Sequence, residues 1–96
     1  MLMDEIRLKN ALSDIVLRII QDNISVEEVR KWVQNELEPN YIWKSESLLI
    51  TDCYYALKHI QEENITTVEW EYFAECFSDL RQYSMEEKIK YINIKH

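Results

Sequence analysis

Apolar residues recur at spacings of three and four along most of the chain, which is the pattern of helices that bury one face. The first such segment runs from Asp4 to Gln21. Its predicted buried stripe consists of Leu8, Leu12, Ile15, Val16 and Ile19, and is widened by Ile6, Leu17 and Ile20. We expect this helix to end at Asp22–Asn23, because asparagine tolerates the left-handed conformation that closes many helices.

Ser25 and Glu28 have the spacing of a capping box, in which each side chain binds the backbone N–H of the other residue. They predict a second helix that begins after Ser25. Its predicted buried positions are Val26, Val29, Val33 and Leu37. Pro39 cannot continue this helix, so we expect residues 39–46 to form a loop. Three large apolar residues stand together in this loop, Tyr41, Ile42 and Trp43.

A third helix, capped by Ser45 or Ser47, is predicted to run to Glu62. Its predicted core stripe consists of Leu49, Cys53, Ala56, Leu57 and Ile60. The alternative for residues 48–55 is a β-strand, since isoleucine, threonine, cysteine and tyrosine favour strands. The helical spacing continues for longer than an alternating strand pattern would, so the sequence favours a helix.

Thr66 and Glu69 form a second capping box and predict a fourth helix. Its predicted buried residues are Trp70, Phe73, Phe77 and Leu80. A short last helix is predicted to begin at Ser84, with Glu87 as its capping partner. We expect its apolar residues to pack on the rest of the protein, namely Met85, Ile89 and Ile92. Its lysines are expected to interact favourably with the helix C-terminus, namely Lys88, Lys90 and Lys95.

These elements predict an all-α fold, a single domain over residues 1–96 with four longer helices and a short C-terminal helix. The chain contains no glycine, which argues against tight β-hairpins and against glycine-rich loops that bind phosphate. Thr66 lies 41 residues after Ser25, and several apolar positions match at the same offset. The offset has two explanations. Either the chain contains two related helical hairpins, or the match is a coincidence, because any two helical hairpins share capping residues and apolar stripes.

The chain carries 18 Asp and Glu against 11 Lys and Arg, a formal net charge of −7. Such a charge disfavours binding to nucleic acid and anionic membranes and favours a basic protein partner. We find no signal peptide or membrane-spanning pattern and expect a cytoplasmic protein. Cys53 and Cys76 lie among apolar residues, which indicates buried free thiols. No short pair of cysteines or histidines suits zinc, so we expect neither a metal nor a cofactor.

Two groups of residues are predicted to form a surface for a protein partner. The first group lies on the fourth helix, opposite its buried stripe and beside Tyr72, which we also expect to be exposed. Its acidic members are Glu71, Glu75 and Asp79. The second group is aromatic and consists of Trp43, Tyr54 and Tyr55, residue types that dominate interface hot spots. For Trp43 and Tyr54, packing in the core is an equally good interpretation.

Asp52, Tyr55 and His59 share one face of the third helix. An acid that orients an imidazole is the start of a general base, which makes an enzyme one hypothesis. Asp52 and His59 are two turns apart, however, and no nucleophile stands beside them. The sequence therefore favours a surface without catalytic function.

In its size, acidity, helical hairpins and lack of a catalytic signature, the chain resembles the small bacterial immunity proteins, which neutralise a toxin made by the same cell. The segment from Asp52 to Tyr55 is similar to the acidic residue and tyrosine pair by which nuclease-colicin immunity proteins bind a basic nuclease. This resemblance implies a non-enzymatic inhibitor that binds a basic toxin domain through an acidic, tyrosine-bearing surface. The alternative is a structural or regulatory adaptor that associates with itself as a homodimer.

Overall fold

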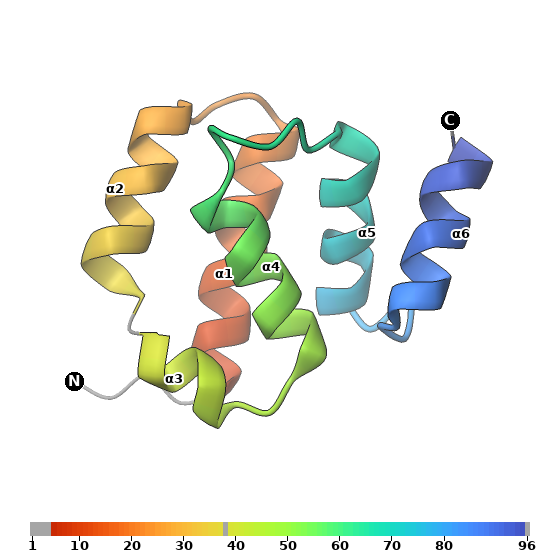
Figure 1. Ribbon diagram of the computed structural model, residues 1–96, viewed down its shortest axis with the longest axis horizontal. Helices are drawn as coiled ribbons and strands as arrows, with labels where there is room; N and C mark the ends of the chain where they lie inside the picture. Colours follow the sequence, from red (N-terminus) through yellow and green to blue (C-terminus); the bar gives the residue numbers. More distant parts are fainter. Residues whose placement is uncertain (1–4, 38, 96) are drawn as a thin grey trace.

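The structure is a computed structural model that describes residues 5–37 and 39–95, and all its regular elements are helices (Figure 1). They are α1 (Glu5–Ile20), α2 (Val26–Glu36), α3 (Pro39–Lys44), α4 (Leu48–Lys58), α5 (Thr67–Phe77) and α6 (Met85–Lys95). The predicted all-α bundle is confirmed, and the strand alternative for residues 48–55 is wrong because they form most of α4. No helix within the described ranges is long and apolar enough to cross a membrane.

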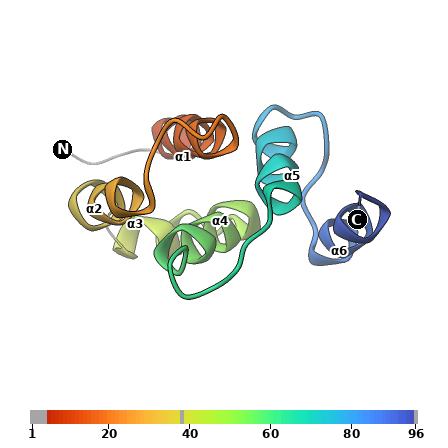
Figure 2. The same ribbon diagram turned by 90° about the horizontal axis from the view of Figure 1, so that it is seen from above.

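The helices form two layers when the molecule is seen from above (Figure 2). α1 lies over α4, α2 lies at one side, and α5 stands at the other side in contact with both α1 and α4. α6 is the outermost helix and packs on α5. Helices of the first predicted hairpin therefore contact helices of the second, α1 against α5 and α2 against α4.

The apolar stripes of the first two helices form much of the core, largely as predicted. Four residues of α1 are buried, Leu8, Leu12, Ile15 and Val16. Ile6 and Leu17, which the prediction added to this stripe, are exposed. Val29 and Val33 of α2 are also buried, whereas Val26 is exposed, contrary to the prediction. Val26 is the first residue of α2, so its side chain lies at the edge of the bundle.

The predicted helix starts at Ser25 and Thr66 are confirmed. Both hydrogen bonds of the capping box at Ser25 and Glu28 are present. Ser47, rather than Ser45, caps α4. The hydroxyl oxygen of Thr66 accepts a hydrogen bond from the Glu69 N–H, but the Glu69 carboxylate binds Lys88.

Three connections differ from the prediction. Residues 39–44 form the short helix α3 with Ile42 in the core, because proline is well suited to the first turn of a helix as well as to ending the previous one. α4 ends at Lys58, four residues before the predicted end at Glu62. α5 ends at Phe77, so Leu80 lies beyond the helix and is exposed, contrary to the prediction.

The buried faces of α5 and α6 also differ from the prediction. Tyr72 has no exposed surface, although we expected it to face solvent. On α6, Met85 and Ile89 are exposed, whereas Lys88 and Tyr91 are buried. The reason is that α6 packs on the side of α5 that carries Tyr72, so this side becomes part of the interior.

Candidate binding surface

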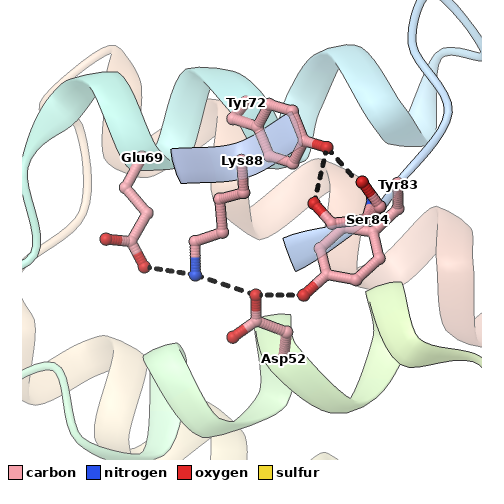
Figure 3. A network of polar contacts seen from close by, with 6 residues as sticks. All are labelled: Asp52, Glu69, Tyr72, Tyr83, Ser84 and Lys88. Atoms are coloured by element: carbon pink, nitrogen blue, oxygen red, sulfur yellow. Dashed lines mark hydrogen bonds and ion pairs between the residues drawn. The ribbon is translucent and has the colours of Figure 1, made fainter. Parts of the chain in front are cut away.

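Lys88 holds α6 against α4 and α5 through a network of polar contacts (Figure 3). Its Nζ lies 2.8 Å from Asp52 Oδ2 and 2.9 Å from Glu69 Oε2, and its side chain is only 9% exposed. The Tyr83 hydroxyl donates a hydrogen bond of 2.6 Å to the same Asp52 oxygen. Asp52 is therefore engaged inside the protein, which leaves it poorly placed for the partner contact that the sequence suggested.

The electrostatics of this network favour a charged Lys88. Burial opposes the ammonium form, but hydrogen bonds from Lys88 to Asp52 and Glu69 outweigh it and raise the pKa of Lys88 above its ordinary value. Burial, together with the hydrogen bond to the Asp52 carboxylate, raises the pKa of Tyr83 far above its ordinary value. The network thus joins the Lys88 ammonium group to the carboxyl groups of Asp52 and Glu69 and to the Tyr83 hydroxyl.

A second set of contacts fixes the connection between α5 and α6. The Tyr72 hydroxyl accepts a hydrogen bond of 3.2 Å from the Ser84 N–H and lies 3.2 Å from the Ser84 carbonyl oxygen, to which it donates. The Glu75 carboxylate accepts hydrogen bonds from the Tyr91 hydroxyl and from Arg81 Nε. Arg81 also lies over the Tyr91 ring, 4.7 Å from its centre.

These contacts change the picture of the predicted acidic face. Glu71 and Glu75 are half-buried, and Glu75 is bound to Tyr91 and Arg81. Asp79 is exposed, but it lies after the end of α5 in the left-handed conformation. The three residues do not form one continuous exposed face on α5, because α6 and its connection engage part of it.

A row of rings at the surface runs from Trp43 on α3 through Tyr55 on α4 to His59 just after α4, and we call these three residues the aromatic row. The Trp43 and Tyr55 ring centres are 6.2 Å apart in an edge-on arrangement. The Tyr55 and His59 rings are nearly parallel at 6.1 Å. Trp43 is 55% exposed and Tyr55 is 44% exposed. His59 Nδ1 lies 3.6 Å from Glu62 Oε2, so the row ends at a solvent-exposed carboxylate.

The third predicted aromatic residue, Tyr54, is in a different position. It is buried, and its ring lies under Lys58 Nζ at 5.9 Å. It helps to line a cavity of about 400 Å³ beside α2 and α4. The alternative interpretation of Tyr54 as a core residue therefore agrees with its burial, and Trp43 is the exposed member of that pair.

The residues of the enzyme hypothesis are not gathered in one centre. Asp52 binds Lys88 and Tyr83, whereas His59 stacks on Tyr55 and lies near Glu62. Over the described ranges, no group of three or more His, Cys, Asp or Glu is placed to hold a metal ion. Cys53 and Cys76 are buried free thiols, and burial raises the pKa of both.

Sequence reasoning named Trp43 and Tyr55 as binding residues but did not place His59 in the binding surface. The spacing of four residues between Tyr55 and His59 was a signal for ring stacking on a helix. The place of Trp43 beside them depends on how α3 packs against α4, which no local pattern specifies.

No family model, curated protein or solved structure matches the chain. The resemblance to immunity proteins therefore depends only on the overall character of the chain and on the segment from Asp52 to Tyr55.

Proposed function

We propose that the protein is a non-enzymatic binding protein that docks on a basic protein partner through the aromatic row. In its specific form, the proposal is an immunity-type inhibitor that covers the active site or substrate groove of a toxin domain. The observation that carries the proposal is that Trp43, Tyr55 and His59 pack on one another while Trp43 and Tyr55 are exposed.

The geometry of the aromatic row suits a binding hot spot. Tryptophan and tyrosine contribute much of the binding energy in many interfaces. Here each ring already packs on its neighbour, so less side-chain freedom is lost when a partner covers the row. Neighbouring exposed aromatic rings leave apolar area in water, and contiguous area of this kind is typical of interaction sites.

Charge supports a basic partner. The net charge of −7 attracts a cationic protein over a distance of about one Debye length, which is roughly 8 Å at physiological salt. Glu62 stands at one end of the aromatic row, and Glu63 follows it in an exposed turn. A lysine or arginine of the partner can therefore pair with a carboxylate while apolar side chains cover Trp43 and Tyr55.

The proposal is tested by affinity capture from the source lysate, with binding then measured on the purified captured protein. We expect the wild-type chain to retain a basic protein at low salt and to release it at high salt. Trp43→Ala and Tyr55→Ala should each weaken binding about tenfold or more, as expected for hot-spot truncation. Ile94→Ala is the matched control, because Ile94 is an exposed apolar residue outside the row.

The inhibitor form has its own measurement. The purified protein should abolish the toxic activity of the captured partner at equimolar concentration, and Tyr55→Ala should require more protein for the same effect. Equal retention by the row variants and the control would refute the role of the row. Dimerisation that rises with concentration and is lost in Trp43→Ala would assign the row to a second copy of the chain.

A further inference from the structure

α6 is attached to the rest of the protein mainly by polar side chains. Of its side chains from Met85 to Ile94, only Lys88 and Tyr91 are buried. Both make charged or hydrogen-bonded contacts, Lys88 with Asp52 and Glu69, and Tyr91 with Glu75. Ile94 is 81% exposed, and Met85 and Ile89 are also exposed. By contrast, α1 buries four aliphatic side chains.

The face beneath α6 is both acidic and aromatic, and we call it the covered face. It consists of Asp52 on α4 and of Glu69, Tyr72, Phe73 and Glu75 on α5. The Phe73 ring lies 5.0 Å from Lys88 Nζ, and the Tyr72 ring centre lies 5.4 Å from that of Tyr91. In Figure 3, the Lys88 side chain reaches between Glu69 and Asp52. The covered face is therefore complementary to a helix that presents a lysine and an aromatic residue.

We propose that α6 is a detachable helix, and that the covered face binds a lysine-bearing helical segment of a basic protein when α6 leaves it. The partner segment needs a lysine for Asp52 and Glu69 and an aromatic residue three positions later, as α6 has in Lys88 and Tyr91. This site shares no residue with the aromatic row, so either one can fail without the other.

Release of α6 without general unfolding follows from the kind of contacts that hold it. The attraction within a buried ion pair is largely offset by the cost of removing its charges from water. Segments with few buried apolar side chains open more readily than the core around them. When α6 leaves, Tyr72 loses its contact with the Tyr91 ring and Phe73 loses Lys88. The aliphatic contacts among α1, α2, α4 and α5 involve no residue of α6 and remain.

Because residues 78–84 tether α6, it competes with any partner at a high effective concentration. The apparent affinity of a partner is reduced by the fraction of molecules in which the covered face is free. A change that weakens the α6 contact should therefore increase the affinity for an added helix.

The first measurement is native-state hydrogen exchange on the full chain. Amides of α6 should exchange through openings about tenfold or more frequent than those of α1 and α5. Lys88→Met should increase α6 exchange about tenfold or more, because it leaves Asp52 and Glu69 without their cation. Lys90→Met is the matched control, since Lys90 pairs only with exposed glutamates of α6 among the described residues. Exchange of α6 only together with α1 would overturn the proposal.

The second measurement adds a labelled synthetic peptide with the sequence of residues 84–96 to the Lys88→Met chain. We expect the peptide to bind this chain about tenfold more tightly than it binds the wild type. A peptide carrying Lys88→Met should lose about tenfold in affinity, and one carrying Lys90→Met should lose little. If the Lys88→Met chain does not fold, Tyr91→Phe replaces it, because this variant removes only the hydroxyl that binds Glu75.

Two outcomes would overturn the inference at this stage. One is a chain with released α6 that does not bind the peptide. The other is a dimer that grows with concentration and exchanges α6 between copies, which would assign the covered face to self-association. If Trp43→Ala or Tyr55→Ala no longer captures the basic partner, neither of these outcomes is affected. Binding by the aromatic row and binding by the covered face are therefore tested separately.

Discussion

Tyr72→Phe removes one hydroxyl from the interior. It tests the structure, in which Tyr72 is buried, against the sequence pattern, which predicted that Tyr72 is exposed. The Tyr72 side chain has no exposed surface, and its hydroxyl bonds to the backbone of Ser84. A hydrogen bond contributes about 1 kcal/mol, and a buried group left without its partner adds about 1 kcal/mol more. We therefore expect the free energy of unfolding to fall by about 1–2 kcal/mol. For a domain of this size the melting temperature should fall by at least about 4 °C.

The assay is urea unfolding monitored by circular dichroism. The free energies of the wild type and the variant are compared at a common slope against urea concentration only if both proteins show that slope. Tyr55→Phe is the matched control, because it makes the same chemical change on a side chain that is 44% exposed. We expect this control to change stability by less than about 0.5 kcal/mol. Equal stability of the two variants would refute the burial of Tyr72 and, with it, the packing of α6 on α5.

Three further outcomes are expected. Ser25→Ala should cost about 1 kcal/mol in urea unfolding, because it removes the cap of α2, and an unchanged midpoint would contradict the capping box. Burial and the hydrogen bond to Glu75 raise the pKa of Tyr91 from 10.0 to about 12, so its stabilisation is complete below about pH 10 and is lost between about pH 10 and 12. The fall in urea midpoint over this range should be smaller in Tyr91→Phe. The Cys53 and Cys76 thiols, whose pKa values burial raises, should react with a thiol reagent only after unfolding, and fast labelling of the folded chain would contradict their burial.

The sequence predicted those parts of the fold that depend on local chemistry. The helical spacing of α1 and the cap of α2 at Ser25 are confirmed, because neither depends on distant parts of the chain. α3 was missed because Pro39 was interpreted only as the end of a helix, although it also suits the start of one.

The contacts of α6 were beyond local reasoning. Lys88 was assigned to a helix terminus, yet its partners Asp52 and Glu69 lie far away in the sequence. Met85 and Ile89 had the better apolar spacing, but the side of α5 that receives α6 offers the carboxylates of Glu69 and Glu75 and the ring of Tyr72. Which face of a terminal helix is buried is decided by the surface opposite it, and an apolar pattern alone does not describe that surface.

The left-handed residues have a consequence for how rigid the molecule is. Asp22, Glu46 and Asp79 have φ angles of 57°, 56° and 62°, and each lies in a connection between helices. Glycine would adopt this conformation with less strain, but it would also leave the unfolded chain more freedom to lose on folding. A chain without glycine has some backbone strain in its turns, but its connections between helices have fewer accessible conformations. The left-handed Glu46 therefore makes a stiff corner between α3 and α4, and a partner of the aromatic row meets a surface that is already formed.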